Sequence, residues 1–246
     1  MQDGWVRDFR VEESKVRLFM KTDGLVDLID YTLLSPTATR ENIADFCKET
    51  IKYGFKTVFV NPYYVSYANE FLKDNDVKVG VPIGFSLGGA TTKTKVAETV
   101  DAIKNGAREI DMLINLGALK SQEYSIVKYD IQEVVKASQG LITKVIIETA
   151  LLTREEKMIA CNLIMEAEAD FVKTATGFNG GGATVDDVAL LRATVGKNFG
   201  VKAAGGIKTY EDAVNIVKAG ANRIGTSNGI KIITGNNSQG SFEQSY

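Results

Sequence analysis

Short runs of apolar and β-branched residues recur along the chain, and an amphipathic stretch of helical length follows most of them. The runs that predict strands cover residues 28–33, 57–60, 78–83, 109–114, 144–147, 170–174, 201–204 and 223–225. The stretches that predict helices include residues 41–53, 91–105, 130–138, 154–167, 185–195 and 210–219. This alternation is typical of repeated βαβ units, which place all their strands in one parallel sheet.

The number and length of these units indicate the fold class. Eight strand–helix units in 246 residues have the size of a closed (β/α)8 TIM barrel of the α/β class. A doubly wound open sheet is the alternative, but it more often carries a glycine-rich dinucleotide fingerprint after its first strand, which this chain lacks there. We therefore predict a single barrel domain over residues 1–246, with an N-terminal helical extension at 1–24 and a flexible, polar C-terminal tail at 234–246.

Residues at the predicted helix ends agree with this reading. Thr153 is followed three residues later by Glu156, the spacing of a capping box in which each side chain bonds a free amide of the first turn. Thr39 has the matching position before the first barrel helix, and Gly54 follows that helix where a left-handed residue ends it. The sequence thus predicts where these helices begin and end.

Charge and cysteine content narrow the partners and the compartment. The chain has 29 Lys and Arg against 31 Asp and Glu and contains no basic block, which argues against nucleic acid and anionic membranes as partners. No apolar run approaches the roughly 20 residues of a membrane helix, and the first residues do not have the pattern of a secretory signal. Cys47 and Cys161 are far apart and suggest no disulfide framework, so we expect a cytoplasmic protein.

The chain contains no histidine, and this excludes several kinds of chemistry. Hydrolases that use a Ser-His or Cys-His pair need an imidazole base, and histidine is also the most common ligand of zinc, copper and non-haem iron. The most common ligand of such metal sites is therefore missing. Any catalysis must depend on Lys, Asp, Glu, Tyr or Thr.

Three ionisable residues interrupt the apolar runs of predicted strands: Asp111, Lys173 and Lys202. Buried charges cost several kcal/mol unless partners or a change of protonation relieve them. The sixth and seventh strands of a barrel are neighbours, so the two lysines can approach, and burial together with like charge favours a neutral amine on one of them. The fourth and sixth strands contribute to the same interior layer, so Asp111 can reach Lys173. A neutral amine, a nearby cation and a carboxylate suit carbonyl chemistry through an imine.

One other interpretation of these charges stays open. A buried Lys–Asp network can simply hold a barrel together, which would make the protein a non-catalytic phosphate-binding barrel. Glycine-rich segments follow the last three strands, at residues 177–184, 203–209 and 225–229. The loops after the seventh and eighth strands are the usual phosphate site of this fold, and glycines let the backbone approach an anion.

Five segments carry a specific resemblance to a known family. They are IDYTLLSP at 29–36, EIDMLINLGALKS at 109–121, FVKTATGFNGGGATVDDVALLR at 171–192, VKAAGGIKTYEDA at 201–213 and RIGTSNG at 223–229. From about residue 25 to residue 232 the chain resembles the deoxyribose-phosphate aldolase family of class I aldolases. The resemblance implies a metal-free, cofactor-free retro-aldol cleavage of 2-deoxy-D-ribose 5-phosphate to acetaldehyde and D-glyceraldehyde 3-phosphate. Transaldolase-like and fructose-bisphosphate-type aldolases are the alternatives among Schiff-base barrels.

The resemblance also assigns roles to residues. It implies that Lys173 forms the Schiff base, that Lys202 favours its neutral form and that Asp111 relays protons. The substrate and phosphate contacts it implies are Thr32, Thr176, Gly177, Gly205, Gly206, Ser227 and Asn228. Asp30 and the C-terminal Tyr246 are possible accessory residues, although for Tyr246 a place in a disordered tail is the favoured interpretation. The partner is then a small phosphorylated sugar, and we expect a homo-oligomer, in particular a dimer.

Glu148, at the end of the predicted fifth strand, has two possible roles. It either hydrogen-bonds the lysine network or serves only the structure of its loop.

Overall fold

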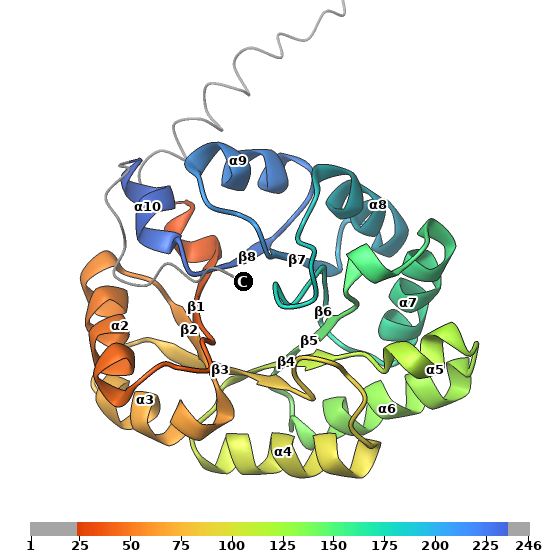
Figure 1. Ribbon diagram of the computed structural model, residues 1–246, viewed down its shortest axis with the longest axis horizontal. Coiled ribbons are helices and arrows are strands. Elements are labelled where there is room, and N and C mark those ends of the chain that lie inside the picture. Colours follow the sequence, from red (N-terminus) through yellow and green to blue (C-terminus); the bar gives the residue numbers. More distant parts are fainter. Residues whose placement is uncertain (1–23, 236–246) are drawn as a thin grey trace, which may run out of the picture.

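Eight parallel strands form a closed barrel in sequence order, with helices around its outside (Figure 1). The computed structural model describes residues 24–235. The strands are β1 Ile29–Leu33, β2 Thr57–Val60, β3 Lys78–Ile83, β4 Glu109–Leu113, β5 Ile142–Ile146, β6 Phe171–Lys173, β7 Gly200–Ala204 and β8 Arg223–Thr226. β1 pairs with both β2 and β8, which closes the barrel and confirms the predicted fold class.

Every connection between consecutive strands contains at least one helix. The α-helices are α2 Arg40–Tyr53, α3 Val65–Leu72, α4 Thr92–Lys104, α5 Leu116–Lys120, α6 Tyr124–Ala137, α7 Arg154–Glu166, α8 Val185–Val195, α9 Tyr210–Lys218 and α10 Gly229–Thr234. Short 3-10 turns lie at Val26–Leu28, Pro62–Tyr64 and Thr149–Leu151. Among residues 24–235, none of the helices combines the length and apolar character needed to cross a bilayer.

Side chains along each strand point alternately into the barrel and towards the surrounding helices. The barrel interior and the core between strands and helices are therefore lined by different residues. Ile110 and Met112 of β4 are fully buried among apolar residues of the core that joins strands to helices, whereas Glu109 and Asp111 point into the barrel. Successive side chains of a strand point to opposite faces, so an apolar residue next to a charged one satisfies both environments. The barrel interior is therefore charged, and its outer layer supplies the hydrophobic core.

The strand register places inward side chains of alternate strands at the same height, in layers of four. From the pairing, the lowest layer contains Thr57, Glu109, Phe171 and Arg223, the middle one Asp30, Gly80, Lys144 and Lys202, and the upper one Phe59, Asp111, Lys173 and Gly225. Lys173 and Lys202 are register partners, yet they belong to different layers because they lie on adjacent strands.

The structure confirms the predicted helix ends. Thr39 accepts from the amide of Asn42, and Thr153 accepts from that of Glu156 while Glu156 accepts from the Thr153 amide. Gly54 ends α2 with φ of 78°, in the left-handed region. These local features come from short sequence spacings, which is why they could be predicted.

The prediction was less accurate where a polar residue interrupts the apolar face of a helix. α6 begins at Tyr124, whereas the sequence pattern placed its start at residue 130. Asp130 lies on the buried face of α6 and is paired there with the buried Lys95 at 2.5 Å, so the apolar periodicity is broken at that position. The predicted extension and tail fall mainly on residues 1–23 and 236–246, outside the described residues.

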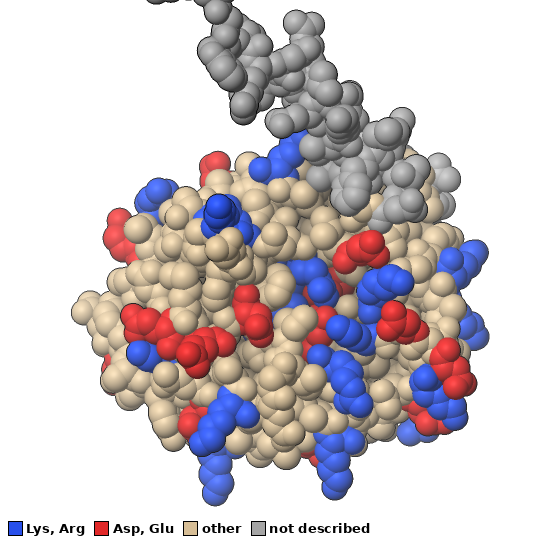
Figure 2. Space-filling view, turned by 180° about the vertical axis from the view of Figure 1, so that it is seen from behind, with Lys and Arg blue, Asp and Glu red and all other residues tan. Residues whose placement is uncertain are grey.

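Charges on the surface lie interspersed. On the face turned away from the view of Figure 1, Lys and Arg alternate with Asp and Glu over the described part of the chain (Figure 2). This agrees with the near balance of acidic and basic residues in the sequence.

We expect Thr153→Ala to lower the free energy of unfolding by about 1 kcal/mol, because it removes the side-chain cap of α7. Urea denaturation of the two proteins measures this difference. Ser66→Ala, at an exposed position inside α3, is the control and should change stability much less. Equal midpoints for Thr153→Ala and the parent would contradict the capping assignment.

Candidate active site

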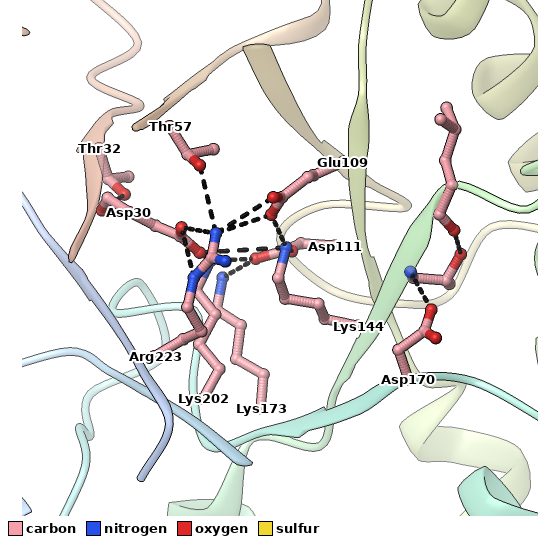
Figure 3. Close-up of polar contacts among 12 residues, drawn as sticks. Asp30, Thr32, Thr57, Glu109, Asp111, Lys144, Asp170, Lys173, Lys202 and Arg223 are labelled. Atoms are coloured by element: carbon pink, nitrogen blue, oxygen red, sulfur yellow. Dashed lines mark hydrogen bonds and ion pairs between the residues drawn. The ribbon is translucent and has the colours of Figure 1, made fainter. Parts of the chain in front are cut away.

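Three residues predicted from the sequence meet inside the barrel. Nζ of Lys173 donates to Oδ2 of Asp111 at 2.8 Å, and Nζ of Lys202 donates to the same oxygen at 2.7 Å. Asp111 is completely buried, and Figure 3 shows both lysine side chains reaching towards it. One carboxylate oxygen therefore bridges two amines that come from neighbouring strands.

Further charged side chains inside the barrel contact this pair. Lys144 donates to Glu109 at 2.5 Å and to Oδ1 of Asp111 at 3.0 Å. Lys202 also forms an ion pair with Oδ2 of Asp30 at 2.6 Å. Arg223 donates to Oδ1 of Asp30 and to both oxygens of Glu109. The lysine pair is thus part of a continuous ionic network (Figure 3).

Two carboxylates of the network, those of Asp111 and Asp30, are held in their charged form. Burial by itself would raise the pKa of Asp111, but Lys144, Lys173 and Lys202 outweigh it and hold that pKa well below its usual value. Burial would likewise raise the pKa of Asp30, and the neighbouring lysines with Arg223 lower it instead. Both groups therefore act as anions at neutral pH.

The pKa values of two lysines in the network, Lys144 and Lys202, are shifted in opposite directions. Burial would lower the pKa of Lys144, yet Asp111, Asp30 and Glu109 raise it above its usual value. Burial lowers the pKa of Lys202 to about 8, with help from the like charges of Lys173 and Lys144 and against the attraction of Asp111 and Asp30. Lys202 therefore gives up its proton more readily than an exposed lysine does.

A cavity of about 90 Å³ lies above the pair, and Lys173 forms part of its lining. Lys202 does not line this cavity and is fully buried beneath it. The predicted contact residues around the cavity are Thr32, Thr176, Gly177, Gly205, Gly206, Ser227 and Asn228. The structure thus brings all seven to one place, above the amine of Lys173.

Two glycine-containing loops pack directly against each other at this cavity. The amide of Ala183 donates to the carbonyl of Gly205 at 3.0 Å. A Cβ on Gly182 would lie 2.6 Å from that carbonyl oxygen, closer than any ordinary contact. Only glycine at position 182 allows the β6–α8 loop to approach the loop after β7.

Glu148 organises the cavity rim and does not join the lysine network. Its carboxylate accepts from the Thr176 hydroxyl at 2.5 Å, from the Thr176 amide at 3.2 Å and from the Asn179 side chain at 2.9 Å. Asn179 in turn donates to the carbonyl of Ser86 at 2.8 Å. Of the two roles considered for Glu148, the structure shows the loop-supporting one.

Of the two possible accessory residues, the structure describes only Asp30. Asp30 lies beneath the cavity, in contact with Lys202 and Arg223. Tyr246 lies outside the described residues.

The sequence analysis did not single out Lys144, Glu109 or Arg223 for the site. Each is the first residue of a strand predicted from the sequence, where a charged residue is ordinarily exposed, whereas in the structure Lys144 is the central residue of β5. A signal was present in the period of two that joins Glu109 to Asp111, since both must point to one face of β4.

Metal ligation has no evident place among the described residues. Within residues 24–235 there is no group of three or more Cys, Asp or Glu side chains arranged to hold a metal ion. The three carboxylates inside the barrel instead contact lysine and arginine side chains.

The fold and the site together define a class: a TIM barrel with a buried lysine pair, one amine of which faces a glycine-lined cavity. Such an amine is the group that Schiff-base enzymes use. Residues 8–235 match the DeoC/LacD family aldolase, and the chain belongs to that family.

Individual relatives are similar over nearly their whole length. Deoxyribose-phosphate aldolase 2 of Oceanobacillus iheyensis is 61% identical over 223 residues, covering 91% of this chain and 100% of that protein. The deoxyribose-phosphate aldolase of Caldanaerobacter subterraneus is 56% identical over 212 residues, covering 85% and 92%. A solved structure, the tetrameric deoxyribose phosphate aldolase of Aeropyrum pernix, has a TM-score of 0.84 at 32% identity and covers 94% of this chain and 97% of that one.

We expect Gly182→Ala to weaken binding of inorganic phosphate at the cavity about tenfold, because the new methyl group separates the two loops. Isothermal titration calorimetry measures the affinity. Gly89→Ala is the matched control, since a Cβ there meets no atom within 4 Å. Equal phosphate affinity in the two variants would show that the contact between the loops does not shape the site.

Proposed function

We propose that this protein is a deoxyribose-phosphate aldolase that reversibly cleaves 2-deoxy-D-ribose 5-phosphate to acetaldehyde and D-glyceraldehyde 3-phosphate. The observation that carries the proposal is the position of Lys173. Of the two amines bridged by Asp111, only that of Lys173 lines the cavity. The activity named for relatives up to 61% identical supports the same reaction.

A charge imbalance supplies the neutral amine. In the described part of the chain, the barrel interior contains three carboxylates, Asp30, Glu109 and Asp111, against four basic side chains. The basic side chains are Lys144, Lys173, Lys202 and Arg223. An unbalanced charge in a water-poor interior is costly, so the network is most stable when one amine is neutral. Because both amines bond the same oxygen of Asp111, the pair loses this proton as a unit.

The reaction follows from this arrangement. The lone pair of neutral Lys173 adds to the aldehyde carbon of the open-chain substrate, and the carbinolamine loses water to give a protonated imine. The C3 hydroxyl loses its proton as the C2–C3 bond breaks, and that electron pair moves into the imine to form an enamine. D-Glyceraldehyde 3-phosphate leaves, the enamine carbon is protonated, and hydrolysis releases acetaldehyde and Lys173. Asp111, within 2.8 Å of the reacting nitrogen, relays protons in the carbinolamine steps.

The glycine-rich side of the cavity receives the phosphate. Gly177, Gly205 and Gly206 have positive φ values of 84°, 87° and 77°, which few other residues adopt. Their backbone can approach the phosphate oxygens closely, and Lys208 in the same lining adds a positive charge. Anchoring the phosphate holds the aldehyde end of the substrate towards Lys173.

Two wider expectations extend this proposal. We expect a homo-oligomer, and the tetramer of the Aeropyrum pernix enzyme supports assembly in general, while a dimer remains our own expectation. The cytoplasm remains the predicted compartment.

We expect borohydride reduction in the presence of acetaldehyde to attach the reduced aldehyde to Lys173. Peptide mass spectrometry locates the modification. Lys173→Leu should neither trap acetaldehyde nor turn over the sugar phosphate, whereas Lys202→Met should still be modified at Lys173, only more slowly. Modification at another lysine, or phosphate binding with no trapping, would favour the non-catalytic barrel. Turnover of other sugar phosphates would favour a different aldolase.

We expect kcat/KM for cleavage to rise with pH and to level off above about pH 8, as the lysine pair loses its proton. In Lys202→Met the interior has equal numbers of acidic and basic groups, so Lys173 keeps its proton to higher pH. Activity at pH 8 should fall at least about tenfold, with the rising limb moved to more alkaline pH. Lys104→Met, at an exposed helix position, is the control. An unmoved limb in Lys202→Met would contradict the coupling.

A further inference from the structure

The ring of Phe59 lies inside the barrel against the lysine amines. Its centroid is 3.8 Å from Nζ of Lys202, 4.8 Å from Nζ of Lys144 and 5.9 Å from Nζ of Lys173. The Phe59 residue is only 1% exposed. The face of an aromatic ring attracts a cation within about 6 Å of its centroid, most strongly when both are removed from water. Lys202 therefore has the closest contact, and Lys173 lies near the limit of the range.

Gly80 makes this position of the ring possible. Phe59 and Gly80 are register partners on β2 and β3. A Cβ on residue 80 would lie 2.3 Å from Cζ of Phe59 and 2.6 Å from each Cε. Any larger residue at position 80 would push the ring away from its place beside Lys202.

The proposed function needs the neutral amine on one particular lysine. Burial lowers the pKa of Lys202 to about 8, so burial by itself favours loss of the proton from Lys202. Lys202, however, does not reach the cavity, and a neutral amine there would leave Lys173 charged and unreactive. A contact that stabilises the ammonium form of Lys202 more than that of Lys173 is required.

We propose that Phe59 is a positioning residue: its ring face keeps the shared proton on Lys202 and so leaves the neutral amine on Lys173. The inference rests on the proposed function and adds to it the group that decides which amine reacts. The other charged groups of the interior come from β1, β4, β5 and β8 and are Asp30, Glu109, Asp111, Lys144 and Arg223. They are the same in every variant below, so a change in the pH profile reports on the ring.

The first test compares Phe59→Leu with the parent in the rate of borohydride trapping of acetaldehyde, from about pH 6 to pH 10. Without the ring, Lys202 loses the shared proton more readily and Lys173 retains it. The rising limb should move to more alkaline pH by up to about one unit, which is up to about a tenfold lower rate at pH 7. The rate should approach that of the parent near pH 10, and KM for the phosphorylated substrate should change little.

Three further variants separate the charge effect from loss of packing. Gly80→Ala keeps the ring but displaces it, and it should move the limb in the same direction. The double variant Phe59→Leu/Gly80→Ala refills part of the lost volume, so it should recover thermal stability while keeping the alkaline profile. Phe46→Leu, a fully buried aromatic residue of α2 outside the barrel, should lose stability with no movement of the limb.

The possible outcomes distinguish the two proposals. Alkaline movement in Phe59→Leu and in the double variant supports the role of Phe59. Suppose that the parent is trapped at Lys173 and that Phe59→Leu and the double variant show either the parent's pH profile or a uniform loss of rate at every pH. That result overturns the role of Phe59 and leaves the proposed function intact. No trapping in the parent at any pH refutes the proposed function itself.

Discussion

One oxygen of Asp111, shared by two lysine amines in a closed barrel, is the interaction on which the site depends. The interior around it contains more basic than acidic groups, and the barrel wall excludes most water. Lys144 is held charged by the carboxylates around it. The adjustable charge is therefore the proton shared by Lys173 and Lys202. A nucleophilic amine is in this sense a property of the whole interior rather than of one residue.

The geometry of the barrel then makes the two lysines unequal. They are register partners, but adjacent strands contribute to different interior layers, so one amine reaches the cavity and the other is sealed beneath it. The amine of Lys173 faces the cavity, while that of Lys202 is held between Asp30, Asp111 and the ring of Phe59. The glycine-containing loops after β6 and β7 pack closely against each other, and this packing places their backbone around the cavity.

Much of this could be predicted from sequence, for reasons that differ by residue. The strand–helix alternation predicted the closed barrel, and the order of the strands brought Asp111, Lys173 and Lys202 together. Lys144, Glu109 and Arg223 were not predicted, because each begins its predicted strand, where a charged residue is usually exposed, and only the observed strands and their register show it inside. The contacts of Glu148 with Thr176 and Asn179 depend on how two loops fold, which no local spacing encodes.

The most direct test of this account is a titration of the lysine amines by nuclear magnetic resonance, with the signals assigned through Lys173→Leu and Lys202→Met. The account predicts that the two amines together lose one proton below the usual range of a lysine and that the amine left neutral is that of Lys173. Full protonation of the Lys173 amine well above about pH 9 would contradict the central claim that the barrel interior makes this amine a nucleophile.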